Sequence, residues 1–149
     1  MHKMKTLPLA LIPLVFAASC ASTSRTFHSD IREGDPCVAT YSLIREYPEQ
    51  AVPIIVGELD ELQKQAEENY NLRLAIIFLT ARNYPESRTN ELAIVLRKAF
   101  DDPDARIREC VVECAADFLG DGAVPFLEEL LKRNDVSDEM REQIRKQVE

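Results

Sequence analysis

The chain has 149 residues, of which 46% are hydrophobic and 30% charged, so its length suits one domain and excludes a large multidomain enzyme. Acidic residues outnumber basic residues by 26 to 18, and the formal net charge of -8 argues against a protein that binds nucleic acid by neutralising phosphates. Only 4 glycines and no tryptophan argue against a glycine-rich phosphate-binding loop and against a β-sandwich. The 4 cysteines suit disulfides in an exported chain or a metal site in a cytosolic one, so the compartment has to be settled first.

The N-terminus has the layout of an export signal. Lys3 and Lys5 precede an apolar stretch at 7–18 that is too short to span a bilayer as a helix. The stretch ends in Ala-Ala-Ser directly before Cys20, which resembles the bacterial lipobox. This resemblance implies that residues 1–19 are a signal peptide and that Cys20 becomes an acylated N-terminus carrying fatty acids such as palmitate.

Two details bear on the destination of the chain. An ordinary signal peptide cut after Ser19 or Ala21 is the alternative to lipidation. In the resemblance to Gram-negative lipoproteins, Ala21 in place of Asp implies the outer membrane, facing the periplasm. Removal of residues 1–19 takes away two lysines and no acid, so the net charge becomes -10. We therefore expect the lipid, and not an electrostatic patch, to hold the protein on the membrane.

Residues 20–34 are predicted to be a lipid-anchored flexible tether. They are small and polar, and Phe27 and Ile31 are the only sizeable apolar side chains after the cysteine. His28 falls in this tether and His2 in the signal peptide, which leaves no histidine for acid–base chemistry in the folded body. We therefore expect the protein not to be an enzyme.

The folded domain is predicted to span 35–149 and to begin with a helix over 36–46 that caps its N-terminal end. Asp35 is a good N-cap, and Pro36 suits the first helical position. The segment 52–56 is the nearest approach to a strand, and Pro53 would confine it to a sheet edge.

Apolar residues at helical spacing predict the remaining helices. The clearest stripe consists of Ile107, Cys110, Val111, Cys114, Ala115 and Phe118. Four shorter stripes consist of Leu72, Ala75, Ile76, Leu79 and Thr80; of Leu92, Val95, Leu96 and Ala99; of Val124, Leu127, Leu130 and Leu131; and of Met140, Ile144 and Val148.

An internal repeat organises these helices. Tyr-Pro-Glu at 47–49 recurs at 84–86, and Ala-Val-Pro at 51–53 recurs at 123–125. Three arginines recur at intervals in the mid-thirties, and each stands four residues after a good N-cap type. The arginines are Arg73, Arg108 and Arg141, and the N-cap candidates are Asn69, Asp104 and Ser137. A period of this length with two helices in each unit is typical of an α-solenoid.

The segment 101–108, the apolar stripe after it and the segment 118–127 together resemble a HEAT repeat of the short, bilin-lyase-like kind. This resemblance implies an all-α fold, a short α-solenoid of about three hairpins. We place the units at 48–84, 85–119 and 120–149. Armadillo-like or tetratricopeptide-like hairpins, or an irregular helical bundle, are the alternatives.

The resemblance also implies a structural role for the arginines. In that family, arginine at this place pairs with an acid in the turn of an adjacent unit, and Asp102 and Asp135 stand six residues before Arg108 and Arg141. A basic ladder that binds an anionic ligand is the alternative, since the fork of arginine suits both.

Two further clusters are weighed against metal or redox chemistry. The acids at 101, 102 and 104 lack the spacing of a calcium loop, and Pro103 among them suits a turn. Cys110 and Cys114 are a redox or metal pair or, as we expect, small apolar side chains between packed helices. We predict no intramolecular disulfide, no metal and no cofactor.

These observations predict a non-catalytic, membrane-tethered helical-repeat protein that binds another cell-envelope protein as a scaffold or adaptor. A structural or self-assembling lipoprotein and a small-ligand carrier or lyase-like protein are the alternatives. The candidate partner face lies on the first helices of the units and consists of Glu58, Asp60, Glu61, Arg97, Lys98, Glu128 and Glu129.

Overall fold

The computed structural model describes residues 12–149, with side chains from residue 21 onward, and this part of the chain is all-helical. The α-helices are α1 (Ile12–Glu33), α2 (Pro36–Glu46), α3 (Pro48–Gln63), α4 (Tyr70–Asn83), α5 (Thr89–Phe100), α6 (Ala105–Phe118), α7 (Ala123–Leu131) and α8 (Asp138–Val148). Single turns of 3-10 helix, η2 (Glu86–Arg88) and η3 (Gly120–Gly122), precede α5 and α7. Between residues 12 and 149 there is no strand, which confirms the predicted all-α class. Residues 1–11 of the predicted signal peptide lie outside the described residues, and residues 12–19 form the beginning of α1.

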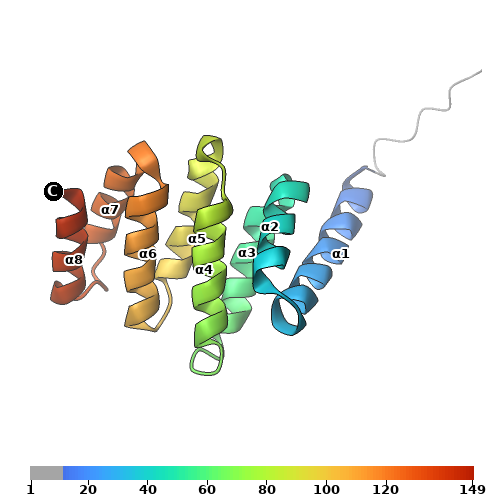
Figure 1. Ribbon diagram of the computed structural model, residues 1–149, viewed down its shortest axis with the longest axis horizontal. Coiled ribbons are helices and arrows are strands. Elements are labelled where there is room, and N and C mark those ends of the chain that lie inside the picture. Colours follow the sequence, from blue (N-terminus) through green and yellow to red (C-terminus); the bar gives the residue numbers. More distant parts are fainter. Residues whose placement is uncertain (1–11) are drawn as a thin grey trace, which may run out of the picture.

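The helices stand side by side in two rows (Figure 1). In one row α2 packs on α4, α4 on α6 and α6 on α8. In the other row α3 packs on α5, and α7 lies beyond them. Helix α1 packs on α2 and α3 at one end of the molecule, and α7 and α8 stand at the other end. The buried apolar side chains of both rows form one continuous core.

The segment that was predicted to be a flexible tether is helical. Residues 20–33 belong to α1, and Phe27 and Ile31 are buried, with 4% and 2% of their surface exposed. These two side chains are four residues apart and lie on one face of the helix. The tether prediction is therefore wrong for this segment, because two well-spaced apolar residues dock an otherwise polar helix on α2 and α3.

Helix α2 has the predicted bounds and the predicted start. The side chain of Asp35 accepts hydrogen bonds from the backbone N–H groups of Cys37 and Val38, and Pro36 occupies the first turn. The helix does not cap the end of the body, however, because α1 packs outside it.

The segment 52–56 is helical and not an edge strand. Pro53 lies inside α3, which begins at Pro48. Pro53 has no N–H to donate to the carbonyl of Glu49, and its ring crowds that carbonyl. The buried residues around it, such as Ile54 and Ile55, keep the segment helical because they complete the apolar face of α3.

The predicted stripes of α5, α6 and α8 coincide closely with their buried faces, whereas two others are displaced. On α4 the buried residues are Arg73, Ile76, Ile77, Thr80 and Ala81, so the buried face is turned by about one residue from the prediction. On α7 the buried residues are Ala123, Phe126, Leu127 and Leu130, and Val124 is 44% exposed.

The N-cap predictions hold at two of the three repeated positions. Asp104 accepts from the N–H of Arg106, and Ser137 accepts from the N–H of Met140. Asn69 precedes α4 but does not cap it with its side chain, which instead donates to the carbonyl of Gln65.

Phe27→Ala is expected to release α1 from the body. The large-to-small change removes the main apolar contact of the helix, a loss of about 3–5 kcal/mol for a fully docked phenylalanine. Hydrogen exchange of the α1 amides should accelerate at least tenfold, whereas α5 should be unaffected. The exposed Ser29→Ala on the same helix is the control, and equal exchange rates in the two variants would contradict the docking of α1.

Pro53→Ala is expected to stabilise the fold. Alanine restores the missing N–H inside α3, where proline costs up to about 3 kcal/mol. Urea unfolding should show a gain in the free energy of unfolding of roughly 1–3 kcal/mol. Pro125→Ala is the matched control, because Pro125 lies in the first turn of α7, where its missing N–H has no helical partner, and it should be near neutral.

Candidate functional site

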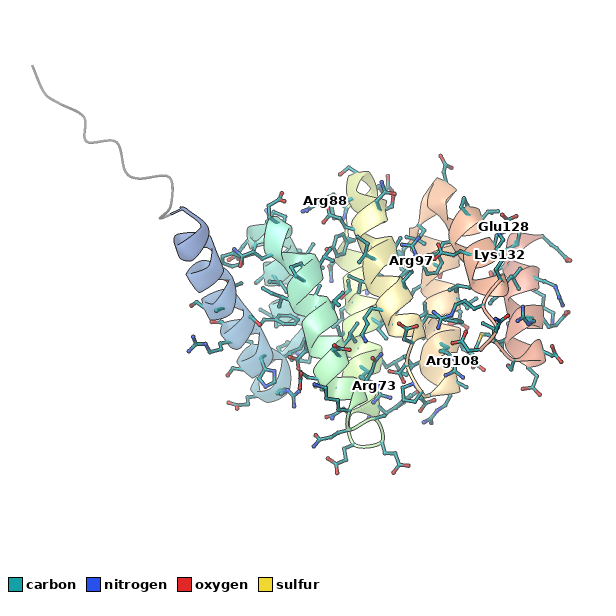
Figure 2. The ribbon with its side chains drawn as sticks, turned by 180° about the vertical axis from the view of Figure 1, so that it is seen from behind. Arg73, Arg88, Arg97, Arg108, Glu128 and Lys132 are labelled. Atoms are coloured by element: carbon teal, nitrogen blue, oxygen red, sulfur yellow. The ribbon has the colours of Figure 1, made fainter. Side chains whose placement is uncertain are left out.

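The three arginines that recur in the sequence make similar contacts with the backbone. Each lies in the first turns of its helix, α4, α6 or α8, and donates to one or more backbone carbonyls of the segment that precedes this helix. The donated bonds run from Arg73 to Ala66, from Arg108 to Asp102 and from Arg141 to Leu131 and Arg133. Figure 2 shows Arg73 and Arg108 near the same edge of the molecule, at the bottom of the view. The arginines therefore supply hydrogen bonds to carbonyl groups that have no donor within a helix.

Arg73 also makes the most deeply buried ion pair of the described residues. Its Nε lies 2.7 Å from Oδ2 of Asp102, and its Nη2 donates to Oδ1 at 3.1 Å, with both side chains fully buried. Asp102 lies in the loop between α5 and α6, so the pair joins neighbouring hairpins. Asp102 additionally accepts from the backbone N–H of Asp104 at 2.9 Å. The carboxylate is therefore held by hydrogen bonds as well as by charge.

Asp135 takes a different partner from the predicted one. Its carboxylate accepts from Arg133 at 2.6 Å and 2.9 Å, and the hydrogen bonds lower the pKa of Asp135 to about 2. Arg133 also lies 2.8 Å from Asp101. Asp135 is thus part of an exposed cluster with Arg133 and Asp101 near the loop before α8, and its ion pair is with Arg133 instead of Arg108 or Arg141.

The acids at 101, 102 and 104 are all used structurally. Asp101 pairs with Arg133, Asp102 pairs with Arg73, and Asp104 caps α6 and pairs with Arg106. Among residues 12–149, no cluster of three or more histidine, cysteine or acidic side chains is arranged to hold a metal ion.

The predicted partner face is largely occupied by ion pairs between helices. Lys98 on α5 pairs with Asp60 on α3. Arg97 on α5 holds both carboxylate oxygens of Glu129 on α7, at 2.8 Å and 3.1 Å from its Nε. The hydrogen bonds from Arg97 lower the pKa of Glu129. These four side chains join neighbouring helices of one row, and Figure 2 shows Arg97 on this side of the molecule.

The other three residues of that face differ from one another. Glu61 pairs with Lys64 on the surface, and Glu128 is exposed. Glu58 is only 6% exposed and is therefore not displayed to a partner. Its carboxylate accepts from Nε of Arg32 at 3.1 Å and lies 2.6 Å from Nδ1 of His28.

Glu58 on α3 thus forms polar contacts with His28 and Arg32 that hold α1 against α3. Its prediction as a surface residue is wrong, because both of its partners belong to the segment that was read as a tether. For the same reason the prediction that no histidine lies on the folded body is wrong for His28, whose ring contacts a buried carboxylate. The four-residue spacing of Phe27 and Ile31 was the available signal that this segment folds.

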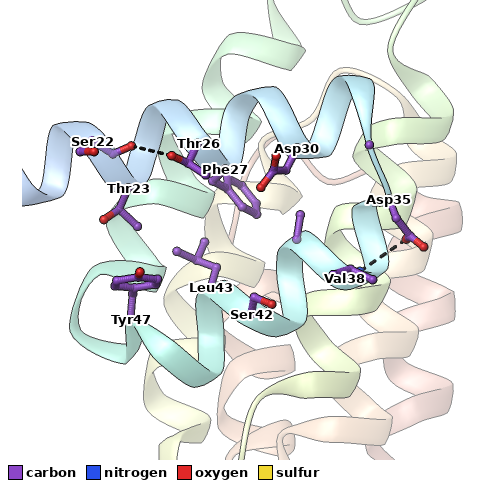
Figure 3. Close-up of a pocket in the computed structure, with 12 residues that line it drawn as sticks. Ser22, Thr23, Thr26, Phe27, Asp30, Asp35, Val38, Ser42, Leu43 and Tyr47 are labelled. Carbon is purple, nitrogen blue, oxygen red and sulfur yellow. Dashed lines mark hydrogen bonds between the residues drawn. The ribbon is translucent and has the colours of Figure 1, made fainter.

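A hollow of about 330 Å³ lies between α1 and α2 (Figure 3). Phe27 reaches into it from α1, and Leu43 and Tyr47 face it from the other side. Asp30 and Asp35 are its only charged lining residues, and Asp35 is already used to cap α2.

Aromatic side chains are exposed on the row that α2, α4, α6 and α8 form, which is called the second-helix row below. Phe78 on α4 is 45% exposed and meets the ring of Phe118 on α6 edge to face, with the ring centroids 6.5 Å apart. Tyr41 on α2 is 44% exposed, and the guanidinium of Arg45 lies over its ring at 5.6 Å. Sequence reasoning assigned Phe118 to the core and missed this surface.

Cys110 and Cys114 are free thiols on α6 whose Sγ atoms lie 3.9 Å apart. Cys114 is buried, and Cys110 is partly exposed. The hydrogen bond between the thiols lowers the pKa of Cys110, whereas the same bond and burial raise the pKa of Cys114. Cys37 is exposed on α2.

No protein-family model matches the chain, and no curated protein or solved structure is significantly similar to it. Within residues 12–149, no helix combines the length and the apolar character needed to cross a membrane.

Asp102→Asn is expected to destabilise the protein by about 3 kcal/mol or more, because it leaves the guanidinium of Arg73 buried without a counter-charge. Urea unfolding measures the change. Asp135→Asn removes an exposed carboxylate of the same repeat position and should cost no more than about 1 kcal/mol. Equal losses in the two variants would contradict the central role of the Arg73–Asp102 pair.

Proposed function

We propose that the protein is a lipid-anchored, non-catalytic α-solenoid of HEAT-like hairpins that binds another protein of the cell envelope as a scaffold or adaptor. Cys20 carries the lipid, and the anchored body faces the periplasm from the outer membrane. The surface around Phe78 and Phe118 on α4 and α6 makes the contact with the partner.

The stacking of the helices supports a solenoid. In three successive hairpins, α3–α4, α5–α6 and α7–α8, the second helices pack in one row, and α1 with α2 precedes them. The arginine at the fourth residue of each second helix donates to a carbonyl of the preceding loop. Recurrence of one local contact in each unit is what a repeat architecture requires, because each hairpin buries its face only against its neighbours.

Half-exposed Phe78, whose ring meets that of partly buried Phe118, is the observation that carries the binding function. An aromatic side chain left 45% exposed beside a second ring offers a large apolar contact at low cost in side-chain entropy. Tyr41, which is 44% exposed, lies on α2 of the same row. On the opposite row, Arg97, Lys98, Asp60 and Glu129 already neutralise one another, and the exposed apolar side chains Ile94 and Val124 are not aromatic.

The anchor rests on the sequence around Cys20. The described body is acidic, so anionic lipid head groups do not attract it, and acyl chains are the remaining means of attachment. Since Cys20 lies within α1 and this helix packs on the body, the anchor would be joined to the solenoid by a helix held at Phe27 and Glu58.

Photo-cross-linking in intact cells tests this function. A photoreactive phenylalanine analogue at position 78 should yield one discrete cross-linked species that contains a second, different protein. The same analogue at position 94 on α5, where Ile94 is similarly exposed at 48%, is the matched control and should not yield it. In the Cys20→Ala variant the protein should leave the membrane fraction, and the cross-link should fall.

The alternatives give different outcomes. A species cross-linked only to a second copy of this chain would favour a self-assembling structural lipoprotein. Equal cross-linking from positions 78 and 94, or none from either, would overturn the assignment of the partner to the second-helix row. Retention of Cys20→Ala on the membrane would overturn the lipid anchor.

A further inference from the structure

The two thiols of α6 stand in a geometry that suits a bridging ion better than a disulfide. Cys110 and Cys114 lie on neighbouring turns of one helix, where the Cβ atoms of residues four apart are about 5–6 Å from each other. A disulfide requires a Cβ separation of roughly 3.5–4.5 Å. The sulfurs themselves already approach to 3.9 Å. The helix therefore brings the sulfurs together without allowing them to bond.

We propose that Cys110 and Cys114 form a two-sulfur binding site for a soft, low-coordinate cation of the Cu(I) type. At a metal–sulfur distance of about 2.3 Å, the value known for zinc thiolates, an ion fits between sulfurs 3.9 Å apart with a bent sulfur–metal–sulfur angle of roughly 115°. Small rotations of the side chains widen this angle.

The number and kind of ligands select the cation. Thiolates favour soft ions such as Cu(I). Zinc in protein sites takes four ligands, and no third histidine, cysteine or acidic side chain completes a metal-binding group among residues 12–149. A cation that is satisfied by two sulfurs therefore fits this pair better than zinc does.

The surroundings favour a dry, protected site. Ile107, Val111 and Ala115 of the same helix are fully buried, and Cys114 lies among them with 3% of its surface exposed. Cys110 is the more accessible thiol and provides the route of entry. Binding of Cu(I) replaces two S–H bonds by two Cu–S bonds, releases two protons and leaves a complex with one negative charge. No electron is transferred, so no oxidant is needed.

Competition with a Cu(I)-chelating dye tests the site. The reduced full chain carrying Cys20→Ser and Cys37→Ser retains only the two thiols of α6 and is titrated with Cu(I) without oxygen. It should withdraw one equivalent of Cu(I) from the dye. Addition of Cys110→Ala should weaken binding at least tenfold, and helical circular dichroism should stay unchanged, because this thiol is only partly buried.

Alkylation gives a second readout in the otherwise unaltered chain. Bound Cu(I) should slow maleimide modification of Cys110 at least tenfold and leave that of Cys37 unchanged. Failure of the folded protein to compete with the dye, equal binding after Cys110→Ala, or protection that does not distinguish Cys110 from Cys37 would each overturn the site. These outcomes do not depend on lipid attachment or on a protein partner.

Discussion

The buried pair of Arg73 and Asp102 is the interaction on which the arrangement of the hairpins depends. A guanidinium and a carboxylate without access to water are stable only when charge and hydrogen bonds compensate both. Arg73 meets that demand by also holding the loop carbonyl of Ala66, and Asp102 meets it by accepting the N–H of Asp104. One ion pair therefore fixes the loop before α4 and the loop before α6. The register of α4 against α6 follows, and with it the juxtaposition of Phe78 and Phe118.

Local signals in the sequence were sufficient for α2 and for α4 to α8 but not for α1, nor for the buried faces of α4 and α7. The caps at Asp35, Asp104 and Ser137 depend on side chains that reach backbone N–H groups two or three residues away, so they can be read from sequence. The buried face of α4 was misplaced because Arg73 counted as polar. Its burial is possible only because Asp102, which is 29 residues distant, supplies the counter-charge. Periodicity contains no information on such a partner.

The fate of α1 shows the same dependence on distant contacts. Taken alone, residues 20–33 have too little apolar surface to order themselves, and the composition predicted a tether. The body supplies what the segment lacks, namely an apolar face for Phe27 and Ile31 and the carboxylate of Glu58 for Arg32 and His28. Glu58 in turn is predicted to be a surface acid because both of its partners, His28 and Arg32, lie in the segment predicted to be a tether. The wrong prediction for residues 20–33 therefore led to the wrong prediction for Glu58, and the packing of α1 on α3 accounts for both.

The distribution of charge determines what each row of helices can contribute to binding. On the row of first helices, cations and acids are paired across neighbouring helices, so a partner that took one of them would have to break a pair that already exists. On the row of second helices, exposed aromatic rings gain free energy simply by leaving water. In the proposed function the surplus of acids would act at longer range, where it would disfavour nucleic acid and anionic lipid head groups as partners. Affinity would therefore arise from the aromatic row, and the acidic charge would restrict which partners reach it.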